Sequence, residues 1–261
     1  MRVLHITRDL PPAAKGGIST AVAGLVSALE RVECRCGVVS FDGWRPSRRA
    51  GESTEPSVEQ KGQSSVLRVS GPSDLAAARR FCLGFSPDLI HVHHGMLWDF
   101  AAGLKGALQV PLVFTVHVHQ AALNALRGVE ERTASLNGQE RALEEADLVC
   151  TPSVACSNAV EATYASLETR TTRLGVEDTE SARAAVMTRS PGELETLTYV
   201  GRFADVKGTR EFLEVARLLL ARRSRLRVRV VGGVPDNAKA DRRWRRRWRE
   251  DTPVDLVDRL E

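Results

Sequence analysis

The sequence predicts an α/β protein built on a mostly parallel sheet with helices on its faces. Short apolar runs alternate with segments whose apolar residues recur every three or four positions, a pattern typical of strands joined by helices. With 43% hydrophobic and 27% charged residues, the 261-residue chain has enough apolar side chains for one large core or two moderate ones. The net charge of +4 favours anionic ligands without singling out nucleic acid.

The first part of the chain contains most of the predicted elements. Strands are expected at residues 2–7, 35–41, 65–70, 89–94, 112–117 and 148–153. The clearest helix covers residues 17–32, where apolar side chains fall three and four positions apart. Residues 43–65 are polar and broken by Gly, Pro and Ser, which predicts a mobile loop.

A domain boundary is predicted at the polar passage over residues 177–193, because a new strand begins at Leu194 directly after it. We expect a first domain over residues 1–185, a linker over 186–193 and a second domain over 194–261. The second domain begins with a strand, a basic turn, a helix and another strand that ends in paired glycines.

The cysteines and the apolar segments bear on the compartment. The five cysteines are odd in number and lack paired CxxC spacing, which favours a reducing cytoplasm over a disulfide framework. The N-terminal apolar run is too short for a signal sequence, and no run approaches the ~20 apolar residues of a membrane span. We therefore expect a cytoplasmic protein.

The basic turn "GRFADVKG" carries Arg202 and Lys207, and Gly208 opens the helix that follows. Ligands of open parallel sheets bind beyond the carboxyl ends of the strands, where a helix start presents free N–H groups to an anion. Gly208 would let the backbone approach a phosphate closely. The alternative is that the two cations are ordinary solvated loop charges, and the turn alone does not separate the two interpretations.

A second candidate loop follows the first strand, where Gly16 and Gly17 precede a helix. It could hold an anion or a sugar hydroxyl at the helix N-terminus, or it could be only a tight turn. The G-x-G-x-x-G spacing is absent, which counts against NAD-dependent chemistry.

Histidines gather at the predicted strand ends. His91 and His93 alternate onto one face of a strand, and His117 ends another strand. No Cys, Asp or Glu stands at a metal-site spacing to them, so we expect no metal. We expect His5 and His93 to be packed and hydrogen-bonded, and His117 to be better placed for substrate. A G-x-S-x-G nucleophile elbow is absent, which counts against a hydrolase.

Taken in order, "MRVLHITRDLPPAAKGGIST", "DLIHVHHG", "VFTVHVH" and "YVGRFADVKGTREFLEVA" resemble the family 4 glycosyltransferases. These are retaining, nucleotide-sugar-dependent enzymes with two Rossmann-like domains in the glycosyltransferase B (GT-B) arrangement. The resemblance covers nearly the whole chain, and the basic turn is its most specific element. It implies transfer of a sugar from a nucleotide sugar to an acceptor, with retention at the anomeric carbon.

The resemblance also implies roles for individual residues. Arg202 and Lys207, with Gly208, grip the donor diphosphate, Gly16 and Gly17 lie beside the donor phosphates or the acceptor, and His117 is the catalytic residue that faces the transferred sugar. Further candidates for the substrate site are His93, Ser153, Gly232 and Gly233. The implied co-substrate is a UDP- or GDP-linked sugar, with no metal and no other cofactor.

The chain departs from the family pattern at two places. Residues 174–177 read "LGVE" where the family usually has Asn-Gly-Val-Asp. After residue 233 the family continues with further βα units and a pair of glutamates, so we expect a second domain with about two strands and two helices. This leaves open a shortened homologue that only binds or needs a partner, or a fragment of a longer or split gene. We also expect an incomplete sheet edge that the tail helix, another chain or a second copy covers.

The tail "AKADRRWRRRWRE" predicts a helix with Trp244 and Trp248 on one face and arginines around it. We favour a helix that packs its tryptophans on the sheet. Peripheral contact with a membrane is the next alternative, because many glycosyl acceptors are lipid-linked. Nucleic-acid binding comes last, and we expect no nucleic-acid partner.

Overall fold

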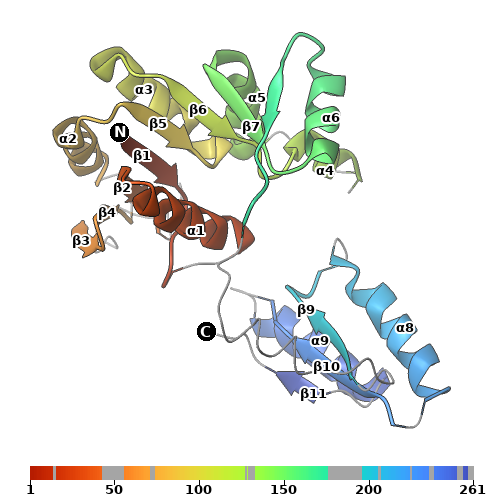
Figure 1. Cartoon of the computed structure of the whole chain (residues 1–261). Helices are drawn as coiled ribbons and strands as arrows, with labels where there is room; N and C mark the ends of the chain where they lie inside the picture. Colours follow the sequence, from red (N-terminus) through yellow and green to blue (C-terminus); the bar gives the residue numbers. More distant parts are fainter. Residues whose placement is uncertain are drawn as a thin grey trace. The chain divides into compact units, whose positions relative to one another are not determined.

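The computed structural model describes residues 1–13, 16–42, 56–70, 74–126, 128, 133–175, 196–204, 207–223, 225–234, 238–251 and 255–257. The chain divides into two compact units, Met1–Glu177 and Asp178–Glu261 (Figure 1). The expected linker over residues 186–193 lies outside the described residues. Each helix among the described residues is too short or too polar to cross a bilayer.

Unit 1 is built on a sheet whose described strands run in the order β3-β4-β2-β1-β5-β6-β7-β8. All neighbouring strands pair in parallel except β3 and β4. The strands are β1 (Arg2–Thr7), β2 (Arg35–Ser40), β3 (Ser57–Lys61), β4 (Ser64–Arg68), β5 (Leu89–Val92), β6 (Leu112–Thr115), β7 (Leu148–Thr151) and β8 (Thr169–Thr171). The strands expected from the apolar runs are therefore confirmed, and the α/β class with them.

Helices cover both faces of this sheet because its buried strands have apolar side chains on both sides. On one face Val22 and Val26 of α1 pack with Val3 and Val38. On the other face α2, α3 and α5 contribute to a larger core that includes Trp98. The helices are α1 (Gly17–Arg31), α2 (Leu75–Phe85), α3 (Trp98–Leu108), α4 (Gln120–Leu126), α5 (Ala134–Glu145) and α6 (Val154–Thr163), with a 3₁₀ turn η2 (Gly95–Leu97) before α3.

The predicted loop over residues 43–65 is wrong in its second half. Ser57–Lys61 forms β3, which pairs antiparallel with β4, and Gly62 makes the turn between them with a positive φ of 63°. Every residue of β3 is exposed, so hydrophobic patterning could not reveal it. Backbone hydrogen bonds to β4 and a glycine turn form this edge strand. Residues 43–55 lie outside the described residues.

Unit 2 is a small parallel sheet whose described strands run in the order β11-β10-β9. Its elements are β9 (Thr196–Val200), α8 (Thr209–Leu220), β10 (Arg227–Val231), α9 (Ala238–Asp251) and β11 (Asp255–Val257). The expectation of two strands was one too few, because β11 in the tail pairs with β10. A strand of the tail therefore extends this sheet next to β10, where we had expected the tail helix, another chain or a second copy to cover the edge.

The core of unit 2 centres on Trp248 of α9, which is fully buried. Its ring lies 5.8–6.0 Å, centroid to centroid, from the rings of Tyr199, Phe203 and Phe212. Trp244 packs against the same cluster. The expected packing of the tail tryptophans is therefore confirmed.

Substitution of Trp248 should destabilise unit 2. Trp248→Ala should cost about 3–5 kcal/mol, because it leaves a cavity among three aromatic rings. Trp248→Phe should cost less, since the buried Nε1 atom of Trp248 has no hydrogen-bond partner in the described part of the chain. Urea unfolding followed by circular dichroism measures both. Arg242→Ala, at an exposed position of the same helix, is the control, and equal stability of the two alanine variants would contradict the packing argument.

Candidate functional site

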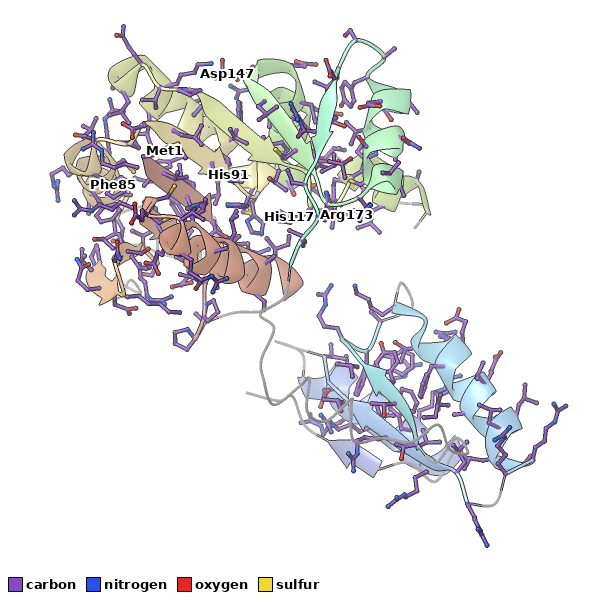
Figure 2. The ribbon with its side chains drawn as sticks, viewed as in Figure 1. Met1, Phe85, His91, His117, Asp147 and Arg173 are labelled. Atoms are coloured by element: carbon purple, nitrogen blue, oxygen red, sulfur yellow. The ribbon has the colours of Figure 1, made fainter. Side chains whose placement is uncertain are left out.

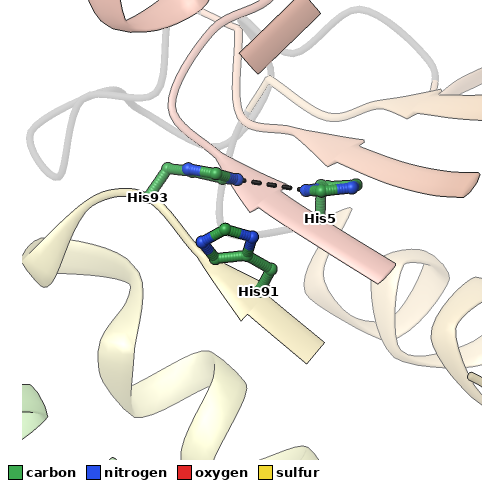
Figure 3. Close-up of side chains that lie close together, drawn as sticks. All are labelled: His5, His91 and His93. Carbon is green, nitrogen blue, oxygen red and sulfur yellow. Dashed lines mark hydrogen bonds between the residues drawn. The ribbon is translucent and has the colours of Figure 1, made fainter. Parts of the chain in front are cut away.

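The carboxyl ends of β1, β5 and β6 place histidines together at one edge of the unit 1 sheet. His5 of β1 lies opposite His91 of β5 in the parallel register, and His93 follows β5 directly. His117 follows β6 and is half-buried. Figure 2 labels His91 and His117 on unit 1, and Figure 3 shows the rings of His5, His91 and His93 gathered at the strand ends.

Three of these histidines form a hydrogen-bonded chain. The Nδ1 atom of His5 lies 3.1 Å from Nε2 of His93, and Nδ1 of His93 lies 3.2 Å from Nε2 of His117. His5 is fully buried and His93 is 3% exposed. The expectation that His5 and His93 are packed and hydrogen-bonded is confirmed. His117, which we predicted to contact the substrate, is the half-exposed last ring of this hydrogen-bonded series.

His91 supports this chain from the side. Its ring centroid lies 4.1 Å from that of His93, and its Nε2 atom lies 2.7 Å from Oγ1 of Thr115. Thr115 is buried in β6, so the bond links β5 to β6 next to the site.

Burial keeps these imidazoles neutral. Desolvation lowers the pKa of His5 and of His117 to about 4, and it lowers the pKa of His94 to about 3. The pKa values of His91 and His93 also fall well below the usual 6.5 because of desolvation and because neighbouring histidines repel a second charge. At neutral pH each ring therefore carries one proton.

The same cluster has to be tested as a metal site. One ring nitrogen from each of His5, His91 and His93 lies within 4.8 Å of the others, which is within the reach of a three-histidine site. However, a ring nitrogen of His5 and one of His93 already bond to each other. Among the described residues, no cysteine or carboxylate joins the group. The hydrogen-bonded arrangement accounts for the cluster, and the absence of a metal stays a prediction.

A close backbone approach positions the segment that carries His93 and His94. A Cβ atom on Gly138 of α5 would come 2.1 Å from the carbonyl oxygen of Gly95 in η2. Only glycine allows this contact, so η2 sits directly against α5. The backbone N–H of Arg8 donates to Nδ1 of His94 over 3.2 Å, which ties the chain after β1 to the same segment. His94 was not among the residues expected from the sequence, although it stands in the quoted "HVHH".

Gln139 of α5 is a second residue that sequence analysis missed. Its side chain is buried. Its Oε1 atom accepts from the backbone N–H of Gln120 at 2.7 Å, and its Nε2 atom donates to the carbonyl of Val118 at 2.8 Å. Gln139 therefore fixes the backbone directly after His117. No sequence pattern marks such a tertiary contact.

The glycine loop before α1 is only partly visible, because residues 14–15 lie outside the described residues. Gly16 caps α1 with an extended backbone and without a side-chain hydrogen bond. A Cβ atom on Gly16 or Gly17 would meet no atom within 4 Å. Packing within the described protein therefore does not require either glycine, and the first turn of α1 carries no acidic residue that would repel an anion.

Ser153 has a structural task. It follows β7 at the same edge of the sheet, and its hydroxyl accepts from the backbone N–H of Cys156 at 3.2 Å. This bond caps the N-terminus of α6. The capping bond accounts for Ser153 without a ligand.

In unit 2, the buried hydroxyls of Tyr199 and Thr209 form hydrogen bonds with the backbone of the basic turn. The Tyr199 hydroxyl donates to the carbonyl of Arg202 at 2.8 Å and lies 2.9 Å from the hydroxyl of Thr209. The Thr209 hydroxyl also bonds the backbone N–H of Ala204 at 3.0 Å. The side chains of Arg202 and Lys207 are exposed. The backbone of the turn is thus held at Arg202 and Ala204, and both cations are in solvent.

Gly208 caps α8 in the left-handed conformation, with φ of 65°, and provides no side-chain hydrogen bond. Its backbone conformation accounts for a glycine here. The first turn of α8 also carries Glu211, whose charge offsets part of the positive helix end. The two cations, more than the helix end, would therefore attract an anion to this turn.

Gly232 and Gly233 have packing reasons of their own. A Cβ atom on Gly232 would come 1.9 Å from the carbonyl oxygen of Gly201, and one on Gly233 would come 2.8 Å from Oδ1 of Asp241. The glycines allow the ends of β9 and β10 and the start of α9 to approach closely. These contacts explain both residues without a ligand.

The neutral histidines should make stability depend on pH. The pKa of His5 and of His117 is about 4 in the folded protein and about 6.5 in an unfolded chain. The unfolded state therefore binds more protons between these values, and stability falls as the pH drops from about 6.5 towards about 4. Each such histidine should contribute up to about 1.4 kcal/mol per pH unit.

Urea midpoints between about pH 7 and pH 5 measure this slope, a range above most carboxylate titrations. The His5→Gln variant should show a shallower slope than the parent whatever its absolute stability. A parent protein whose stability is flat across this range would mean that the histidines are not held neutral.

Comparisons with known proteins were made for the sequence and for the fold. A family model described as "Glycosyl transferase 4-like domain" matches residues 16–175. The fold is similar to that of sucrose-phosphate synthase from Thermosynechococcus elongatus, with a TM-score of 0.70, 17% identity, and coverage of 100% of this chain and 71% of that one. No curated protein matches the sequence.

Two further solved structures share the fold. One is an α,α-trehalose-phosphate synthase (UDP-forming) from Burkholderia xenovorans in complex with glucose-6-phosphate, with a TM-score of 0.69, 15% identity, and coverage of 100% and 75%. The other is the catalytic domain of starch synthase IV from Arabidopsis thaliana bound to ADP and acarbose, with a TM-score of 0.61, 14% identity, and coverage of 99% and 74%. At these identities the likeness establishes the fold.

Proposed function

The chain belongs to the glycosyl transferase 4-like family and has its GT-B fold, and from this premise we propose that it transfers a sugar from a UDP- or GDP-linked donor to an acceptor hydroxyl with retention. The observation that carries the proposal is the basic turn of unit 2. There Tyr199 and Thr209 hold the backbone at Arg202 and Ala204. The side chains of Arg202 and Lys207 are exposed.

The donor diphosphate would bind at this turn. Hydroxyls of Tyr199 and Thr209 already hold the backbone at Arg202 and Ala204, so little conformational entropy is lost there when an anion binds. A diphosphate offers several oxygens to the two cations and to the N–H groups at the start of α8. The resident cations can then balance the charge that develops on the leaving diphosphate.

His117 would contact the transferred sugar as a hydrogen-bonding group. Because burial lowers its pKa to about 4, the ring is a weak base and stays neutral at pH 7, where it can bond sugar oxygens but would hold an abstracted proton poorly. In the proposed step the bond from the anomeric carbon to the diphosphate oxygen breaks. The acceptor oxygen bonds the same face of that carbon, and its proton passes to the leaving phosphate oxygen.

Lys207→Ala should weaken nucleoside diphosphate binding roughly tenfold to a hundredfold. A charge-assisted contact is worth about 1.5–3 kcal/mol, which corresponds to that change in the dissociation constant. Calorimetric titration with UDP and with GDP measures it. Arg242→Ala is the matched control, since Arg242 is an exposed cation on α9 and is not part of the turn. Equal losses in the two variants would show that only overall charge matters.

Turnover is a separate observation from binding. Incubation of the purified chain with UDP- and GDP-linked sugars, followed by NMR, would reveal loss of the donor and the anomeric configuration of any product. Retained configuration, with loss of turnover in Lys207→Ala, supports the proposal. Donor binding without turnover would favour a homologue that only binds, and the absence of both would overturn the proposal.

A further inference from the structure

We propose that His5 and His93 are positioning residues that hold His117 as its Nδ1–H tautomer. In this arrangement Nε2 of His117 accepts a hydrogen bond from His93, and Nδ1–H remains as a donor. The inference follows from two ring-to-ring hydrogen bonds. One joins His5 to His93 (Figure 3), and the other joins His93 to His117. These bonds constrain all three rings together.

The hydrogen bonds along the three histidines must all be donated in the same direction. A neutral imidazole has one N–H donor and one acceptor nitrogen, and desolvation keeps all three rings neutral. His93 uses both of its nitrogens, so it donates through one and accepts through the other. If His93 donates to His117, it must accept from His5, and all three rings carry their proton on Nδ1. If the direction is reversed, all three carry it on Nε2.

The buried end of the chain selects between these two directions. The Nε2 atom of His5 is buried and has no hydrogen-bond partner among the residues that the structure describes. In the reversed direction this atom would carry a proton and would be an unpaired, buried N–H donor, and such orphaned donors are rare in proteins. In the proposed direction it is a lone pair, which folded proteins tolerate better as an unpaired group. The proton therefore sits on Nδ1 of His5.

The tautomer of His5 therefore determines the tautomer of His117, the half-exposed ring of the three. Its Nε2 atom is occupied as an acceptor, and no described residue bonds its Nδ1 atom. His117 thus offers an N–H donor to an oxygen atom of a ligand. If the proposed function holds, the ligand atom is an oxygen of the transferred sugar that accepts a hydrogen bond from Nδ1–H of His117. The same geometry argues that His117 does not act as a base towards the acceptor hydroxyl.

Long-range ¹H–¹⁵N spectra of the full chain, labelled with ¹⁵N-histidine, test the tautomer directly at neutral pH. The ring nitrogens have distinct shifts when protonated and unprotonated, and the His117→Gln variant assigns the signals of His117. We expect a protonated Nδ1 and an unprotonated Nε2 in His117. Free histidine prefers the opposite tautomer, so this result would show that the hydrogen bonds among the three rings set the tautomer of His117. An Nε2–H form of His117 in the parent protein would overturn the proposal.

Two substitutions of His93 separate the hydrogen bond from mere packing. Gln at position 93 retains an N–H donor, so His93→Gln should keep the Nδ1–H tautomer of His117. Leu removes the donor, so His93→Leu should move the His117 proton to Nε2. An unchanged tautomer in a folded His93→Leu variant would contradict the proposal, and the spectrum of the parent protein decides the question if that variant does not fold.

Elemental analysis of the same sample tests the remaining alternative, a bound zinc ion. Stoichiometric zinc bound through His5, His91 and His93 would replace the hydrogen-bonded chain and overturn the proposal. The spectra require no turnover and no donor sugar. A failed transfer assay would therefore leave the tautomer result standing, and a failed tautomer result would leave transfer to be judged by its own assay.

Discussion

Desolvation of His5 and His93 is the constraint on which the unit 1 site depends. Neither ring is more than 3% exposed, so water cannot satisfy nitrogens that the protein leaves unpaired. Burial removes the charge, and neutrality makes each ring one donor and one acceptor. The strand ends must then lie where the rings can bond one another. The register of β1 against β5 and the contact of η2 with Gly138 provide that placement.

In both units, buried polar groups that carry no charge fix the backbone near the candidate site residues. In unit 1, neutral rings and the Gln139 amide lie inside and fix the backbone around His117. In unit 2, the hydroxyls of Tyr199 and Thr209 lie under the basic turn and leave its cations in solvent. Buried neutral groups cost less to desolvate than charges, so they suit a fixed scaffold. Exposed charges remain available to a ligand, and the field between them attracts anions.

Sequence reasoning succeeded where a local pattern determines the structure. Apolar runs located the parallel strands β1, β2, β4, β5, β6 and β7 of unit 1 but not the short β8. The four-residue spacing of Trp244 and Trp248 identified the packed face of α9. It failed where pairing across the sheet decides the outcome. The bonds from His93 to His5 and to His117 depend on strand order, which periodicity does not encode. The exposed β3 and the short β11 form through backbone hydrogen bonds, so hydropathy could not mark them. The assignment of Gly232 to the substrate site stays a prediction, and its close contact with Gly201 is a packing requirement that only the folded chain reveals.

The central claim is that the basic turn of unit 2 binds the diphosphate of a nucleotide sugar. Amide ¹H–¹⁵N spectra of the chain, recorded while UDP or GDP is added, test it at the level of single residues. The account predicts saturable shifts at Arg202 and at Lys207, Gly208 and Thr209, where the turn meets α8. Shifts confined to the exposed arginines of α9, or no saturable shifts with either nucleotide, would contradict it.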